Sequence, residues 1–99
     1  MLQPEDFSDY SGATFQVYLP EGGEPVPLAL REIKLHPERT QTWLRQRPFS
    51  LVFHGPAARA LRASTYEISW PDEAQRHAVF IQLIMGSGPQ GAVYEVIFN

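Results

Sequence analysis

The sequence predicts an all-β fold, a small antiparallel meander of six strands that closes into a barrel or a tightly curled sheet. The first observation is a period of two, in which apolar side chains, many of them aromatic or β-branched, alternate with other residues in segments 15–19, 49–54 and 66–70. The second is turn chemistry, because sequences rich in Gly and Pro separate these segments. The third is that no stretch has the pattern of a substantial helix.

Each strand lies between two such breaks. The breaks are Pro20-Glu21-Gly22-Gly23, Gly55-Pro56, Pro71-Asp72-Glu73 and the hairpin loop 86–91. We therefore expect strands at about 13–19, 25–35, 49–54, 64–70, 77–85 and 92–98. In the second strand the apolar residues change face between Leu30 and Ile33, which predicts a β-bulge or a sharp bend near Arg31-Glu32.

Two segments outside the strands complete the prediction. The segment 4–10 is predicted to form a short N-terminal helical turn, because Pro4 suits the first turn and acidic residues follow it. The polar connection 36–47 has room for one helical turn, and Trp43 and Leu44 are expected to fold it back onto the body.

The last two strands are apolar on both faces, which is typical of strands that have something packed outside them. The covering element is either the N-terminal turn or a second copy of the protein, since a monomer rarely exposes a large apolar patch. The candidate interaction surface comprises Val79, Ile81, Leu83, Val93 and Ile97.

Length and composition predict one globular domain over residues 1–99, with 43% hydrophobic and 12% aromatic residues. The net charge of −3 argues against a nucleic-acid partner, whose phosphates require basic residues. Five of the eight basic residues lie in the middle of the chain, either on solvated loops or in a local anion-facing patch. The absence of cysteine excludes disulfides and thiolate sites.

The sequence predicts neither membrane insertion nor secretion. The N-terminal residues lack the basic and apolar regions of a signal peptide. The most apolar stretch, 78–85, is far shorter than the ~20 residues of a membrane helix. We therefore expect a soluble, cytoplasmic protein.

The polar residues form no recognisable catalytic or metal-binding motif. The three histidines have none of the usual metal-ligand spacings, and Ser87 lies in a Gly-Ser-Gly turn rather than in a nucleophile elbow. The remaining candidate polar site combines His54, His77 and Glu95, which lie on or beside predicted strands. We expect no catalytic residues, no metal and no cofactor, which favours a protein that is not an enzyme.

The order of several short motifs resembles a family of small bacterial proteins that is catalogued only as a domain of unknown function. These motifs are Glu5-Asp6-Phe7, Gly12-x-x-Phe15, Pro48-Phe49-Ser50-Leu51-Val52-Phe53-His54-Gly55-Pro56, Thr65-Tyr66 and Tyr94-Glu95-Val96-Ile97-Phe98-Asn99. The chain departs from the family at His54, where a basic residue is common, and at Ile84-Met85, where a Pro-Val pair is common.

The resemblance implies a small barrel-like domain, a bacterial origin and genomic neighbours similar to tail-fibre or tail-collar proteins. It transfers no catalytic residue. The preferred hypothesis is a binding or assembly module with a protein partner or with itself, accessory to a phage-tail-like or surface assembly. The alternative is a small-molecule-binding barrel or a minor enzyme, which requires an internal cavity.

Overall fold

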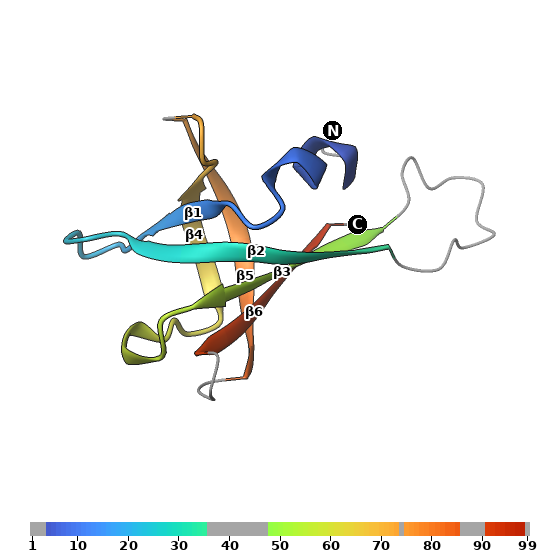
Figure 1. Ribbon diagram of the computed structural model, residues 1–99. Helices are drawn as coiled ribbons and strands as arrows, with labels where there is room; N and C mark the ends of the chain where they lie inside the picture. The colour runs from blue at the N-terminus through green and yellow to red at the C-terminus, as the bar shows by residue number, and fades with distance from the viewer. Residues whose placement is uncertain (1–3, 36–47, 74, 86–90, 99) are drawn as a thin grey trace.

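The computed structural model describes residues 4–35, 48–73, 75–85 and 91–98 (Figure 1). The elements in chain order are η1 (Pro4–Tyr10), β1 (Thr14–Tyr18), β2 (Val26–Leu35), β3 (Phe49–Gly55), η2 (Ala57–Arg59), β4 (Ser64–Ser69), β5 (Arg76–Met85) and β6 (Ala92–Phe98). The predicted all-β class, the six strands and the N-terminal helical turn are confirmed. The predicted turn within 36–47 and most of the loop 86–91 lie outside the described residues.

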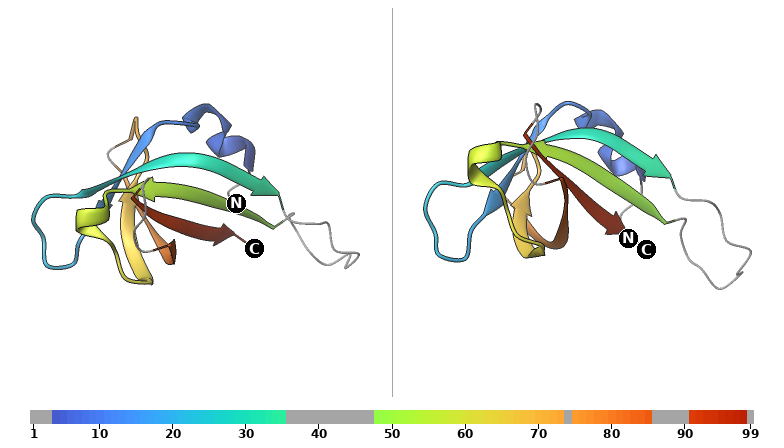
Figure 2. Two further views of the ribbon diagram at one scale, coloured as in Figure 1. Left: turned by 60° about the horizontal axis from the view of Figure 1, so that its bottom comes forward. Right: turned by 90° about the horizontal axis from the view of Figure 1, so that it is seen from below.

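The six antiparallel strands form a closed ring in the order β1-β2-β3-β6-β5-β4, and β4 pairs with β1. Figure 2 shows how strongly the sheet curls. The predicted meander order is correct within β1–β3 and within β4–β6 but wrong between them, because β3 pairs with β6 and not with β4. The ring thus consists of two three-stranded meanders joined along two seams, β3–β6 and β1–β4.

Two glycines allow close packing at one end of the β3–β6 seam. A Cβ atom on Gly55 of β3 would lie 2.6 Å from Cδ2 of Leu28 on β2. A Cβ atom on Gly91 would collide with the carbonyl oxygen of Gly55, and Gly91 also has a φ of +89°, which side-chain-bearing residues rarely adopt. A larger residue at Gly91 would therefore push the start of β6 away from the end of β3.

The middle strands β2 and β5 are the longest, with ten residues each, and each contains a register shift. In β2 the shift falls between Leu30 and Glu32, where the bulge was predicted. In β5 it falls between Leu83 and Met85. Because a bulge bends its strand and increases the local twist, one bulge in each half helps the sheet to close on itself.

The interior of the ring is filled by side chains. Its fully buried large residues come from η1 and every strand and include Phe7, Phe15, Leu28, Leu30, Phe49, Phe53, Ile68, Ile81 and Tyr94. The void among the core residues measures about 10 Å³ and is lined by apolar side chains only. This void is far smaller than the ~300–1,000 Å³ of a small-molecule site, which the alternative hypothesis requires inside the barrel.

The N-terminal turn η1 caps the ring. Its Phe7 is fully buried, with ring centroids 6.0 Å from Phe49, 5.5 Å from Trp70 and 5.7 Å from Phe98. These three partners lie at the ends of β3, β4 and β6. A single aromatic side chain therefore ties η1 to both halves of the sheet.

Candidate functional site

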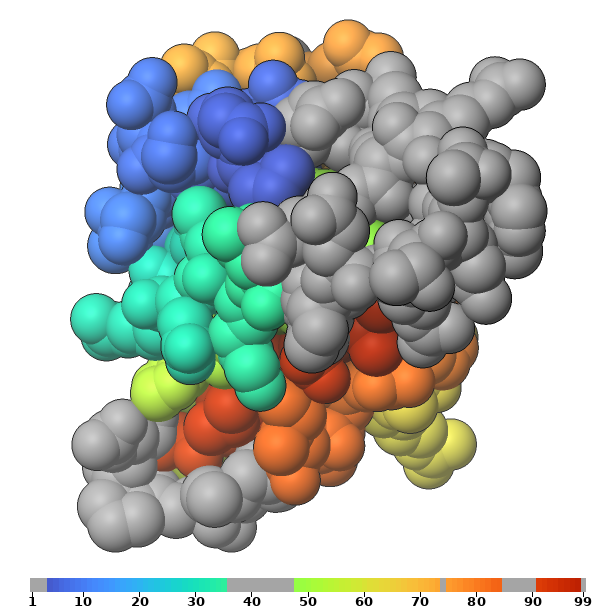
Figure 3. Space-filling view, turned by 90° about the vertical axis from the view of Figure 1, so that its right-hand side faces the viewer, coloured from blue at the N-terminus to red at the C-terminus, as the bar shows by residue number. Residues whose placement is uncertain are grey.

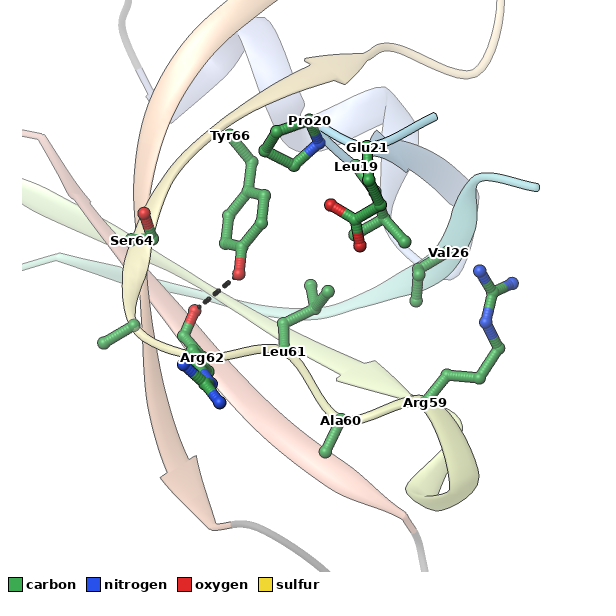
Figure 4. Close-up of a pocket in the computed structure, with 11 residues that line it drawn as sticks. Leu19, Pro20, Glu21, Val26, Arg59, Ala60, Leu61, Arg62, Ser64 and Tyr66 are labelled. Carbon is green, nitrogen blue, oxygen red and sulfur yellow. Dashed lines mark hydrogen bonds between the residues drawn. The ribbon is translucent and has the colours of Figure 1, made fainter. Parts of the chain in front are cut away.

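Two surface features could hold a partner: a groove beside β1 and β4, and an apolar outer face on β5 and β6. The groove has a volume of about 600 Å³, within the range of ligand sites (Figure 4). It lies where the β1–β4 ladder ends, since their pairing covers only Gln16–Tyr18 and Glu67–Ser69. Its lining residues are Leu19, Pro20, Glu21, Val26, Arg59, Ala60, Leu61, Arg62, Ala63, Ser64 and Tyr66.

One wall of the groove is the turn that follows β1. The backbone N–H of Gly22 donates to the carbonyl of Leu19 at 2.9 Å, and Gly22 and Gly23 both have positive φ angles. This turn bends the chain away from β4. Pro20 lies within it and has no N–H to continue the ladder.

The other wall is the segment between η2 and β4, which is fixed from inside the barrel. The hydroxyl of Tyr94 accepts a hydrogen bond from the backbone N–H of Leu61 at 2.7 Å, and both residues are buried. Burial raises the pKa of the Tyr94 phenol, although the bond from Leu61 acts in the opposite direction. Tyr66 closes this wall, because its hydroxyl donates to the carbonyl of Arg62 at 2.9 Å.

The groove carries charges of both signs over an apolar floor. Leu19, Val26 and Leu61 supply the floor. Arg59 is held in place by donating to the carbonyls of Pro25 at 3.1 Å and Glu24 at 2.5 Å. The carboxylate of Glu21 points into the groove from the turn, and Arg62 lies on the opposite wall (Figure 4).

The second feature is the outer face of β5 and β6, where large apolar side chains are exposed. Phe80 is 51% exposed, Ile84 is 55% exposed and Ile97 is 43% exposed. Figure 3 shows residues of β5 and β6, coloured orange to red, side by side on one face of the molecule. We call Phe80, Ile84 and Ile97 the β5–β6 outer face.

The predicted interaction surface overlaps this face only in part. Ile97 and Leu83 are exposed and Val93 is partly buried, whereas Ile81 is fully buried and Val79 packs against the core. The face of β5 was misassigned because its apolar residues follow both parities, so alternation alone gives no direction. The pairing of β5 with β4 shows which side chains of β5 face inward, because Val79 lies opposite the inward-facing Tyr66 of β4.

The three residues of the predicted polar site are not brought together. His77 lies at the start of β5, with its ring centroid 4.0 Å from that of Trp70 and its Nε2 3.4 Å from a carboxylate oxygen of Glu73. His54 lies near the end of β3, where it pairs with Val93. Since β3 and β5 both run antiparallel to β6, these two histidines lie towards opposite ends of the ring.

Glu95 lies in the middle of β6, between Val52 and Gln82. Within 4–35, 48–73, 75–85 and 91–98, no group of three or more His, Cys, Asp or Glu residues could hold a metal ion. No helix in the described part of the chain is long and apolar enough to cross a membrane.

The groove is the feature that sequence reasoning missed. Its residues come from three separate segments, 19–21, 26 and 59–66, which only the strand pairing brings together. Pro20 is the one local signal, because proline marks the end of a ladder, but it gives no information about the opposite wall.

A comparison with models of protein families identifies the family of the chain. A family model described as a domain of unknown function, DUF6916, matches residues 2–98. No curated protein and no solved structure matches the chain.

Proposed function

The chain belongs to the DUF6916 family of domains of unknown function, and from this premise we propose that it is a non-enzymatic binding module. It associates with another protein, or with a second copy of itself, through the β5–β6 outer face. The sequence resemblance suggests a phage-tail-like or surface assembly in bacteria as the setting. The observation that carries the proposal is the exposure of Phe80, Ile84 and Ile97 on adjacent strands.

The surroundings of this face support an interface. Aromatic and large aliphatic side chains are typical of interface centres, and polar residues are typical of the rim. Phe80 lies opposite Thr65 of β4, and Gln82 pairs with Glu95 across β5 and β6. Polar side chains therefore flank the apolar ones along both strands.

Burial of the β5–β6 outer face against a partner would contribute enough free energy to stabilise a complex. Full burial of one large apolar side chain contributes ~1.5–3 kcal/mol, and about half of each of these three is exposed. Covering all three would contribute roughly 2–5 kcal/mol, and each 1.4 kcal/mol corresponds to about a tenfold change in Kd.

The test is the double variant Phe80→Glu, Ile97→Glu, compared with the parent protein in sedimentation velocity and in a pull-down from native lysate. About half of each side chain is buried in the folded chain, so the free energy of unfolding of the variant should be lower than that of the parent protein by roughly 1.5–3 kcal/mol, and urea denaturation checks that it remains folded. We expect self-association, or capture of a partner in near-equal amount, to fall at least tenfold.

The matched control is Thr14→Glu, which adds a carboxylate to an exposed position on β1, away from β5 and β6. It should associate like the parent protein. If the double variant is folded and keeps every association, or if the control loses them equally, the β5–β6 outer face is not the interface.

A further inference from the structure

We propose that the groove between β1 and β4 docks an extended peptide, which adds a short strand to the edge of β4. This site is separate from the β5–β6 outer face, because the groove lies on the β1 side of β4 and β5 lies on its other side. The peptide carries an apolar anchor residue, with a basic residue and an acidic residue at the alternate positions on either side of it.

The backbone of β4 supports a strand as the ligand. Ser64–Tyr66 pair with Val79–Ile81 of β5 on one side, but on the β1 side the ladder stops at Tyr18 and Glu67. Backbone groups of successive strand residues point alternately to the two neighbours. At least one residue of this stretch therefore turns its N–H and C=O toward the groove, where the described residues supply no strand partner.

The chain's own β1 cannot fill this position. The carbonyl of Leu19 already accepts from Gly22, and Pro20 has no N–H. A free strand edge beside a pocket is the arrangement used in recognition by β-strand addition, in which main-chain hydrogen bonds give affinity and pockets select alternate side chains.

The groove also specifies the side chains. Leu19, Val26 and Leu61 form an apolar floor for the anchor residue, and the ring of Tyr66 forms a wall beside it. Glu21 on one wall favours a basic residue, and Arg62 on the other favours an acidic one. Because strand side chains on one face recur every second residue, the pattern is basic-x-apolar-x-acidic, in either direction.

The experiment is panning of a phage-displayed library of random heptapeptides against the full chain, followed by fluorescence anisotropy with the enriched peptides. We expect enrichment of the alternating pattern. Glu21→Arg and Arg62→Glu should each weaken binding of the enriched peptides at least tenfold. Ala63→Trp, which fills the groove from an exposed position, should abolish binding.

Two controls separate this site from other surfaces. Glu32→Arg makes the same charge change at an exposed position of β2 that does not line the groove, so binding should stay within twofold. Phe80→Glu alters the β5–β6 outer face and should also leave peptide binding unchanged. Failure to enrich any peptide would overturn the proposal, as would equal binding to the folded Ala63→Trp variant and the parent protein.

Discussion

The two halves of the ring, β1–β3 and β4–β6, have the same strand arrangement but differ in the side chains that they expose on the outer surface. Each is a three-stranded meander whose middle strand has ten residues and a register shift. The exposed residues of β2 are mainly polar or small, with Leu35 at the end of the strand as the exception, whereas β5 exposes Phe80 and Ile84. The same backbone plan is thus compatible with a polar outer surface, so the apolar surface of β5 is a property of its sequence and not of the fold.

The two seams between the halves differ as well. Along β3–β6, seven residues of one strand pair with seven of the other, whereas along β1–β4 only three pairs form. The long seam closes the ring firmly, and the short one leaves the groove beside Tyr66. A closed ring can therefore leave one short strand edge open without exposing a whole edge strand to aggregation.

The largest loss of stability is expected when the residue that contacts both halves is replaced. Phe7→Ala removes a fully buried ring that contacts Phe49 from the first half and Trp70 and Phe98 from the second. We expect the free energy of unfolding to fall by about 3–5 kcal/mol, measured by urea denaturation. Ser8→Ala, at the neighbouring exposed position, should change it by less than about 0.5 kcal/mol. A small loss in Phe7→Ala would mean that η1 does not close the ring in solution.

The next largest loss of stability tests which side chains of β5 face the core. Ile81→Ala should lower the free energy of unfolding by about 2–5 kcal/mol, because Ile81 is fully buried in the core. Phe80→Ala, one residue earlier on the exposed face, should cost less than about 1 kcal/mol although it removes a larger side chain. Equal losses in thermal or urea unfolding would show that both faces of β5 are covered in the isolated protein.

These two residues also mark the limit of prediction from sequence. The strands and the bulge near Arg31-Glu32 were predictable because their apolar residues alternate and then change parity once. In β5 both parities are apolar, so the inward position of Ile81 follows only from the pairing with β4, which places Val79, on the same face as Ile81, opposite the inward-facing Tyr66. The strand order and the groove could not be predicted from the sequence either. The β3–β6 and β1–β4 seams join segments that lie far apart in the chain, and no local sequence pattern identifies such partners.

The smallest expected change in stability concerns a hydrogen bond between the two halves. The hydroxyl of Tyr10, just before β1, donates to a carboxylate oxygen of Asp72 at 2.7 Å in the turn that follows β4. This hydrogen bond, with smaller contributions from desolvation and from nearby acidic residues, raises the pKa of Tyr10 from 10.0 to about 12. The folded protein therefore holds the phenol proton more tightly than the unfolded chain does.

The stabilisation from this bond is complete below the unfolded pKa of 10.0 and is lost as the pH rises to about 12. Tyr10→Phe should flatten the alkaline fall in the free energy of unfolding over this interval, measured by urea denaturation at a series of pH values. Some slope should remain, because burial also raises the pKa of Tyr94. Asp72→Asn, which keeps an acceptor but removes the charge, should flatten the fall less than Tyr10→Phe. If all three proteins show the same alkaline slope, the Tyr10–Asp72 bond does not form in solution.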